Sequence, residues 1–199
     1  MFVVVTGGSG SGKSEYAENR VLEFNDPLRF YVATMQSYDA ESEARIARHR
    51  KLRAGKGFET VERQLDLKNL DLSEWKQEGA GEHERGSGTV SVLLECVSNL
   101  AANEMFDPAG AGENALGEIE LGIDRLLEQC DNLVAVTNEI FSDGVTYSPE
   151  TQAYQDLLGK INRYMVARAD EAVEVVCGIP VCIRASDGGR RDAVTDRPG

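Results

Sequence analysis

The sequence predicts an α/β fold in which a mostly parallel sheet carries helices on both faces. Short, nearly continuous apolar runs alternate along the chain with helical patterns, as expected for parallel strands that are buried on both sides. The 199 residues are enough for one such domain with its own core. We therefore expect a single domain over residues 1–184, followed by a polar, mobile tail over residues 185–199.

The first half of the chain predicts two strands and two helices. The β-branched run Phe2–Thr6 predicts a strand that stops at a glycine loop, and a helical pattern then covers residues 13–21. A second strand is expected over residues 29–34 and a charged helix over residues 39–53. Residues 61–70 fit neither pattern clearly, so they are left unassigned.

The second half begins with a polar, glycine-rich segment over residues 73–88, which predicts a surface loop. A strongly apolar strand follows over residues 90–96, and apolar spacing predicts a helix around residues 119–127. The remaining expected elements are a strand over 133–137, a long helix over 152–169, and two strands over 172–176 and 181–184.

Charge is unevenly distributed along the chain. The net charge of -13 argues against a nucleic-acid backbone as the main partner, because domains that bind one carry a basic excess. Residues 45–56, here called the basic segment, nevertheless contain no Asp or Glu, and their cations are Arg45, Arg48, Arg50, Lys51, Arg53 and Lys56. A basic segment on an acidic molecule suits a compact anion such as a triphosphate.

We expect a cytoplasmic protein without a signal peptide or membrane insertion. Met1 leads directly into the first strand, and no apolar run is long enough to span a bilayer. The four cysteines, Cys96, Cys130, Cys177 and Cys182, show no CxxC spacing. They are therefore expected to be reduced thiols without a chemical role.

A phosphate-binding motif follows the first strand. The pattern G-x-x-x-x-G-K-[ST] is matched at every fixed position by Gly7, Gly8, Ser9, Gly10, Ser11, Gly12, Lys13 and Ser14. Glycines let successive backbone N–H groups turn toward phosphates, and the helix that starts there adds its positive end. Lys13 is expected to reach the β and γ phosphates, and Ser14 to offer its hydroxyl to Mg²⁺.

Glu95 is the candidate for a second magnesium ligand. It closes the apolar run VSVLLE, and P-loop folds place a metal-holding carboxylate at the end of such a strand. A carboxylate that simply leaves a strand end for solvent fits the sequence almost as well. The apolar run favours the metal ligand, and the alternative stays open.

His49 lies inside the basic segment, whereas His83 lies in the polar loop and is expected to be solvated. On a helix, His49 shares a face with Arg45 and Arg53, and these positive neighbours keep the imidazole neutral. A neutral ring nitrogen is a competent nucleophile at phosphorus, and guanidinium groups stabilise the charge that develops there. By spacing alone, a charged surface helix with an incidental histidine is the more common arrangement.

A set of ordered motifs resembles one enzyme family. The motifs are VTGGSGSGKS around the first loop, YVAT at 31–34, ARIARHR at 44–50, ETVE at 59–62, LLEC at 93–96, VTNE at 136–139, GKINR at 159–163 and VCGIPV at 176–181. Together they resemble the bifunctional adenosylcobinamide kinase / adenosylcobinamide-phosphate guanylyltransferase of cobalamin biosynthesis, from the first strand to about Arg184. Such an ordered set is far more specific than the phosphate loop alone.

The resemblance implies a three-layer P-loop NTPase fold, a homotrimer, and a nucleotide site near the subunit boundary. It implies phosphorylation of adenosylcobinamide by ATP or GTP, then transfer of GMP from GTP to adenosylcobinamide phosphate. In the pattern R-I-x-x-H-R it assigns His49 as the residue that carries the GMP. The rest of the guanine nucleotide site is implied to comprise Ala33, Thr34, Met35, Arg50, Lys51, Leu52, Arg53, Glu62 and Glu95.

The chain departs from the family at the phosphate loop. Ser9 and Gly10 replace the family's Ala-Arg pair, which removes a possible phosphate contact. The departure leaves open whether the kinase half is active and whether ATP or GTP serves it. Two other interpretations also stay open: a plain P-loop kinase of another hydroxyl substrate without a covalent intermediate, and a nucleotide-dependent assembly protein.

Overall fold

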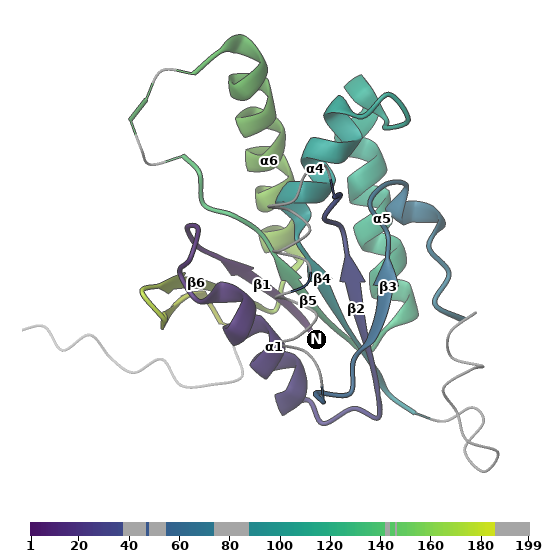
Figure 1. Ribbon diagram of the computed structural model, residues 1–199. Coiled ribbons are helices and arrows are strands. Elements are labelled where there is room, and N and C mark those ends of the chain that lie inside the picture. The colour runs from purple at the N-terminus through teal and green to yellow at the C-terminus, as the bar shows by residue number, and fades with distance from the viewer. Residues whose placement is uncertain (38–46, 48–54, 74–87, 142–143, 146, 186–199) are drawn as a thin grey trace, which may run out of the picture.

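The computed structural model describes residues 1–37, 47, 55–73, 88–141, 144–145 and 147–185. These residues form a seven-stranded sheet in the order β3-β2-β4-β5-β1-β6-β7 (Figure 1). The strands are β1 (Phe2–Thr6), β2 (Leu28–Ala33), β3 (Glu59–Glu62), β4 (Val90–Glu95), β5 (Asn132–Val136), β6 (Glu171–Val176) and β7 (Ile179–Arg184).

Strands β1 to β6 run parallel, and β7 returns antiparallel to β6 at one side of the sheet. The C-terminal ends of the six parallel strands therefore meet along one edge, here called the carboxyl edge. Ligands of open parallel sheets bind at this edge, where loops leave the strands. The phosphate loop leaves β1 there, so the candidate site belongs to this edge.

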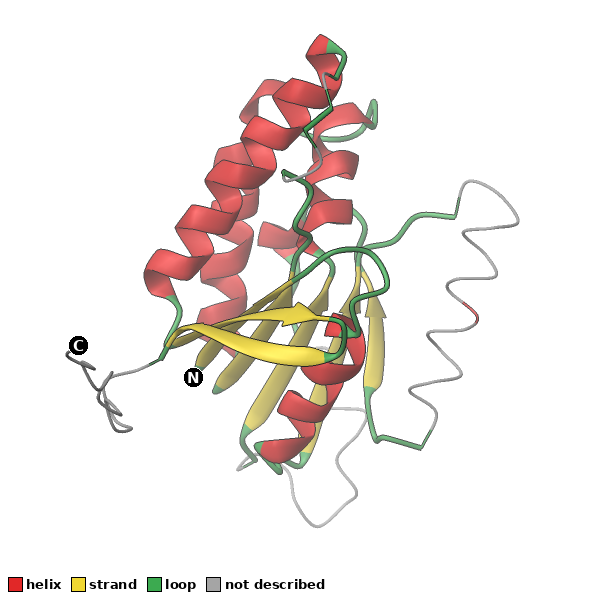
Figure 2. Cartoon of the chain, turned by 90° about the vertical axis from the view of Figure 1, so that its left-hand side faces the viewer, coloured by secondary structure: helices red, strands yellow, loops and turns green. Residues whose placement is uncertain are grey.

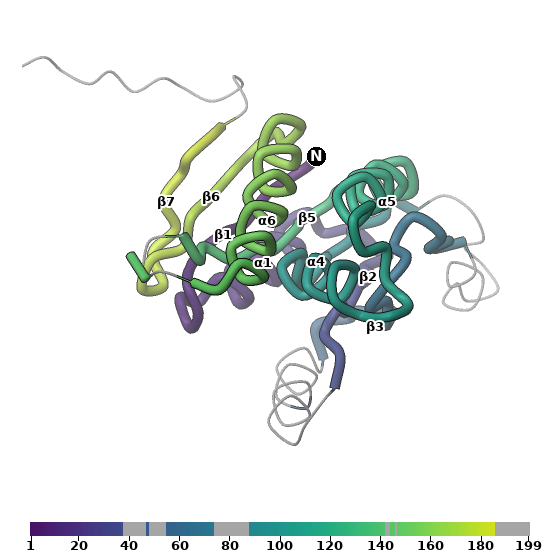
Figure 3. Tube along the Cα trace, turned by 90° about the horizontal axis from the view of Figure 1, so that it is seen from above, coloured from purple at the N-terminus to yellow at the C-terminus, as the bar shows by residue number. Residues whose placement is uncertain are grey.

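Helices cover both faces of the sheet (Figure 2). Helix α1 (Lys13–Glu23) packs on one face, and α4 (Val97–Phe106), α5 (Ala115–Gln129) and α6 (Pro149–Arg168) pack on the other, where they contact one another (Figure 3). Side chains alternate between the layers: Val3 and Val5 face α1, whereas Phe2 and Val4 face the other three helices. The predicted α/β fold with helices on both faces is confirmed.

One strand, one α-helix and two short 3-10 helices were not predicted from the sequence. Strand β3 lies at the start of the unassigned region and has four residues, too few for a periodic pattern; the 3-10 helix η1 (Leu67–Asn69) follows it. Helix α4 buries the polar side chains of Ser98, Asn103 and Glu104 together with its apolar ones, which hides the helical apolar period. A second 3-10 turn, η2 (Gly112–Asn114), precedes α5.

Some expectations fall on residues that the structure does not describe. These are the helix expected over 39–53 apart from residue 47, the interior of the loop over 73–88, and the tail after residue 185. Within the described part of the chain, no helix is long and apolar enough to cross a membrane. The four cysteines are free thiols.

Candidate nucleotide site

The phosphate loop joins β1 to α1 at the carboxyl edge. Gly12 precedes α1 with a left-handed φ of 91°, which only glycine adopts without strain. A Cβ on Gly7 would lie 2.6 Å from the carbonyl oxygen of Val175, so glycine is needed there for close approach. The Gly178 N–H, in the turn between β6 and β7, donates to the Ser11 carbonyl at 2.8 Å. The β6–β7 hairpin therefore supports the loop from behind.

Lys13 is the cation of this loop. Its ammonium group donates to the Gly8 carbonyl at 3.0 Å, within the loop itself. Burial lowers the pKa of Lys13, and the nearby Cys96 and Glu95 oppose that shift. A partly desolvated ammonium group gains more from an incoming phosphate than a fully hydrated one.

Glu95 ends β4 directly beside the phosphate loop. The Ser14 hydroxyl donates to Oε1 of Glu95, so the strand end and the first turn of α1 are in contact. The second oxygen, Oε2, is buried and has no hydrogen-bond partner among the described residues. A buried carboxylate oxygen without a partner is costly unless a ligand completes it.

The donor set at this point fits Mg²⁺. This ion prefers oxygen ligands and is held by one or two protein groups together with substrate phosphates. Ser14 Oγ and the open oxygen of Glu95 are such groups, placed at the predicted phosphate loop. Among the described residues no cluster of three metal-binding side chains occurs, and a magnesium–nucleotide site does not require one.

The sheet register arranges three predicted nucleotide contacts in a row. Ala33 is the Cα partner of Glu62 on one side and of Glu95 on the other. Tyr31 and Leu93, two residues earlier in β2 and β4, pack on the α1 face. Because side chains of a strand alternate between faces, the row Glu62–Ala33–Glu95 also faces the α1 side. It is here called the carboxylate row. It leads from the phosphate loop across the carboxyl edge to β3.

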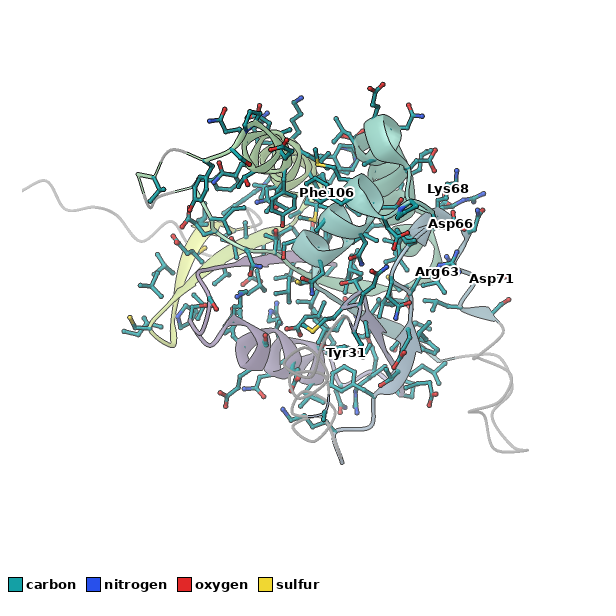
Figure 4. The ribbon with its side chains drawn as sticks, turned by 45° about the horizontal axis from the view of Figure 1, so that its top comes forward. Tyr31, Arg63, Asp66, Lys68, Asp71 and Phe106 are labelled. Atoms are coloured by element: carbon teal, nitrogen blue, oxygen red, sulfur yellow. The ribbon has the colours of Figure 1, made fainter. Side chains whose placement is uncertain are left out.

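The row ends in a hollow of about 410 Å³, lined by Gln36, Glu62, Arg63, Gln64, Leu65 and Asp66. Arg63 donates to the carbonyl and carboxylate oxygens of Asp66, at 2.6 and 2.8 Å. The buried carboxylate of Glu104 accepts from the Asp66 N–H at 2.6 Å. Figure 4 shows Arg63, Asp66 and Lys68 on this side of the molecule. Phosphate loop, carboxylate row and polar hollow thus form one continuous edge.

Comparison with known proteins agrees with this arrangement. The sequence profile of the family described as "Cobinamide kinase / cobinamide phosphate guanyltransferase" matches residues 3–183, which include every predicted site residue. The chain belongs to this family. The resemblance inferred from the ordered motifs is therefore confirmed.

Two curated relatives match along their whole length. "Bifunctional adenosylcobalamin biosynthesis protein CobU" of Escherichia coli (strain K12) is 34% identical, over 92% of this chain and 100% of the relative. The protein of the same name from Salmonella typhimurium (strain LT2) is 32% identical over the same shares. Among solved structures, a type III secretion ATPase aligns with a TM-score of 0.48 and 9% identity, over 87% of this chain and 50% of that chain. A likeness that distant adds nothing here.

For this family member, part of the predicted site lies outside the described residues. That part comprises His49, Arg50, Lys51, Leu52 and Arg53. Among the cations of the basic segment, Lys56 is the one that the structure describes. Lys56 pairs with the buried carboxylate of Glu18 on α1. Phe58 packs edge-on against Tyr31, with ring centroids 6.2 Å apart. The chain therefore leaves the carboxyl edge after β2 and returns along the α1 face.

Thr34 has a different environment from its neighbours in the predicted site. Its side chain is fully buried, and its hydroxyl donates to the Cys96 carbonyl at 2.8 Å. Asn103 of α4 donates to the Thr34 carbonyl at 2.8 Å and to the Gln64 carbonyl at 2.9 Å. These bonds fix the exits of β2, β3 and β4 relative to one another. Asn103 was missed by sequence reasoning, because α4 itself was not predicted and the partners of Asn103 lie in loops that follow other strands.

Proposed function

We propose that this chain phosphorylates adenosylcobinamide and then transfers GMP from GTP to adenosylcobinamide phosphate, which yields adenosylcobinamide-GDP. Family membership supplies the pair of reactions. The observation that carries the proposal is the open oxygen of Glu95 beside Ser14 and Lys13, at the head of a row that ends at Glu62. This arrangement supports a magnesium–nucleotide site at the carboxyl edge.

Lys13, Ser14 and Glu95 have separate tasks in this proposal. Lys13 exchanges its bond to the Gly8 carbonyl for the β and γ phosphates of the nucleotide. Ser14 and Glu95 would hold Mg²⁺, which when bound would neutralise charge on the phosphates. The backbone N–H groups of residues 7–12 surround the phosphates, and the positive end of α1 adds to their attraction.

In the kinase step, the acceptor hydroxyl oxygen forms a bond to the γ-phosphorus of the nucleotide. The bond from that phosphorus to the β–γ bridging oxygen breaks, and the nucleoside diphosphate leaves with the electron pair. Glu62 and Ala33, farther along the row, face the side on which the nucleoside would lie. ATP and GTP are both possible donors.

In the guanylyl step, a ring nitrogen of His49 forms a bond to the α-phosphorus of GTP, and pyrophosphate leaves with the electron pair. A phosphate oxygen of the acceptor then displaces the histidine. His49 follows Ser37, the last described residue at the β2 exit, by twelve residues, and an extended chain of that length spans up to about 40 Å. The chain returns at Gly55 on the α1 face, so this reach includes the carboxylate row.

A labelling experiment tests the proposal. The protein is incubated with Mg²⁺ and GTP labelled at the α-phosphate, and adenosylcobinamide phosphate is then added. We expect an acid-labile, base-stable label on the protein that passes to the corrinoid. His49→Ala should lose this label while still transferring γ-phosphate to adenosylcobinamide. A wild-type protein that transfers γ-phosphate but never carries label would be a plain kinase, and one that does neither would contradict the proposal.

We also infer that the chain assembles as a homotrimer and works in the cytoplasm. Strand β7 at the side of the sheet leaves Ile179, Val181 and Ile183 exposed by 66, 46 and 58%. An edge strand with exposed apolar side chains is a surface that another chain can cover. Sedimentation equilibrium should give three times the mass of the chain, and a monomer at micromolar concentration would contradict the trimer. The free thiols fit a reducing compartment.

A further inference from the structure

The residues that follow β5 lie between the phosphate loop and Glu95. In the strand order, β5 stands between β4, which ends at Glu95, and β1, which leads into the phosphate loop. The Glu139 N–H donates to the Gly7 carbonyl at 3.1 Å. In the other direction, the Asn138 side-chain amide donates to the Ser98 hydroxyl at 2.7 Å. Residues 138 and 139 therefore connect the phosphate loop to α4, the helix that follows Glu95. Glu139 contacts the loop through its backbone, and Asn138 contacts α4 through its side chain.

The backbone on both sides of Asn138 is held in place. Before it, the Thr137 hydroxyl, almost fully buried, donates to Oδ1 of Asn162 on α6 at 2.7 Å. After it, Glu139 is bonded to the phosphate loop. Behind it, the buried Ser98 hydroxyl also contacts the Cys96 thiol, and the Tyr154 hydroxyl donates to the Ser98 carbonyl at 3.0 Å. Such a supported side chain can hold a reacting group in a narrow range of positions.

The side-chain amide of Asn138 uses its nitrogen in a hydrogen bond within the protein, whereas its oxygen can accept one from a ligand. Nδ2 is engaged with Ser98, and no described residue is seen to donate to Oδ1. Asn138 is half-buried, so Oδ1 can accept a hydrogen bond from a ligand at the carboxyl edge. A hydroxyl group donates one such bond and keeps its lone pairs for attack at phosphorus.

The surface beyond Asn138 suits a large acceptor with apolar faces. Tyr154, which is bonded to Ser98, packs against Phe106 with ring centroids 6.3 Å apart, and Phe106 is 54% exposed. Figure 4 shows Phe106 on α4. On the loop that leaves β5, Phe141 is 46% exposed. An apolar macrocycle has aromatic surface to contact here while its hydroxyl arm extends toward Asn138.

We propose that Asn138, held by Ser98, positions the acceptor hydroxyl between the phosphate loop and Glu95, and that the corrinoid body lies over Phe106 and Tyr154. This inference rests on the proposed kinase function. The acceptor oxygen binds the γ-phosphorus, the bond to the bridging oxygen breaks, and the nucleoside diphosphate leaves. The hydroxyl proton passes to the transferred phosphoryl group, whose second pKa near 6 releases it to water. Asn138 orients the hydroxyl and takes no proton.

The test compares Asn138→Ala, Ser98→Ala and the control Asn114→Ala, an exposed residue before α5 whose side chain makes no capping bond. Three quantities are measured: kcat/KM for adenosylcobinamide in γ-phosphate transfer, the Kd for GTP, and GMP bound to protein without acceptor. Asn138→Ala should lower kcat/KM on the order of 10²-fold, with the other two quantities within about twofold of wild type. Ser98→Ala should fall in between, and the control should match wild type.

Three outcomes would overturn the inference. If Asn138→Ala keeps kcat/KM within twofold of wild type, Asn138 does not position the acceptor. If GTP affinity falls in parallel with kcat/KM, Asn138 supports the phosphate loop instead. If wild-type protein binds GTP but transfers no γ-phosphate, the proposed kinase function fails together with this inference. Thermal unfolding of each variant shows whether a loss of activity reflects a loss of fold.

Discussion

Two carboxylates at opposite ends of the parallel strands, the buried Asp26 and the half-buried Glu95, differ in how fully they are hydrogen-bonded. Asp26, at the end where β4 and β5 begin, accepts from the Thr89 hydroxyl at 2.5 Å, the Ser91 hydroxyl and the Asn132 amide at 2.7 Å. Glu95, at the carboxyl edge, has Ser14 on one oxygen and leaves its other buried oxygen without a partner among the described residues. The first carboxylate is satisfied within the protein, and the second needs a ligand.

The difference separates residues that stabilise the fold from residues that bind substrate. A fully hydrogen-bonded buried carboxylate contributes to stability and has no capacity left for a ligand. A carboxylate with an open buried oxygen costs stability until a cation binds, which is how functional sites hold their groups ready. We therefore expect replacements of the two residues to have opposite profiles in stability and in activity.

The largest effect is expected for Glu95→Gln. The amide keeps the shape of the side chain and removes the negative charge that would hold Mg²⁺. Activity should fall by about 10²–10³-fold, the size seen when a group that stabilises transition-state charge is lost. The free energy of unfolding without nucleotide should change by less than about 1 kcal/mol. Steady-state kinetics measures the activity, and urea unfolding measures the free energy of unfolding. The exposed Glu113→Gln is the control, and retained magnesium-dependent activity in Glu95→Gln would contradict the comparison.

Asp26→Ala should show the reverse profile. It leaves three donors, in β4 and β5 and directly before β4, without their shared acceptor, so the free energy of unfolding should fall by about 2–4 kcal/mol. GTP affinity of the folded protein should stay within about twofold of wild type, since Asp26 lies at the opposite end of the sheet. Urea unfolding and equilibrium GTP binding provide the measurements. Unchanged stability would show that the Asp26 network is not what holds these strand ends.

A further carboxylate, the buried Glu18 on α1, sharpens the comparison because its partner belongs to the basic segment. Lys56 is partly exposed and pairs with it. Lys56→Ala should leave Glu18 buried and unpaired, lowering the free energy of unfolding by about 1–3 kcal/mol. Combining Glu18→Leu with Lys56→Ala should recover most of that loss. Urea unfolding of wild type, the two single variants and the double variant completes a double-mutant cycle, and losses that simply add would show that the pair contributes no coupling.

The smallest expected effect is on the stability of the protein at acid pH. Burial raises the pKa of Asp26, but hydrogen bonds from Ser91, Thr89 and Asn132, together with the nearby Arg29 charge, outweigh it and leave the pKa below its ordinary value of 3.8. For a lowered pKa, the stabilisation is complete above the unfolded value and is lost as pH falls through the folded value. Wild type should therefore lose stability below about pH 4 more steeply than Asp26→Asn. Parallel curves from urea unfolding between pH 5 and pH 3 would exclude this contribution.

The sequence predicted the parts of the molecule that local patterns encode. The phosphate loop depends on consecutive glycines before Lys13, and the central strands are continuous apolar runs, so both could be identified from neighbours along the chain. Asp26, Asn103 and Asn138 could not, because their partners come from other strands and helices. Asp26 and Asn132, for example, are bonded although 106 residues separate them. Their roles exist only once the sheet order is known.

The row of predicted nucleotide contacts was only partly accessible from the sequence. Ala33, Glu62 and Glu95 were assigned by resemblance, and the sheet register brings them side by side on the α1 face. The hollow beyond Glu62 gave no sequence signal, because it depends on Glu104 and Asn103 of α4 holding the loop that follows β3. His49 stays a prediction, since it lies outside the described residues.

The most direct test of the whole account is mass spectrometry of the protein after incubation with GTP and Mg²⁺ and without an acceptor. The account predicts a GMP adduct on the peptide that contains His49, released pyrophosphate in equal amount, and loss of the adduct in Glu95→Gln. A protein that binds GTP at the phosphate loop and yields no adduct on that peptide would contradict it.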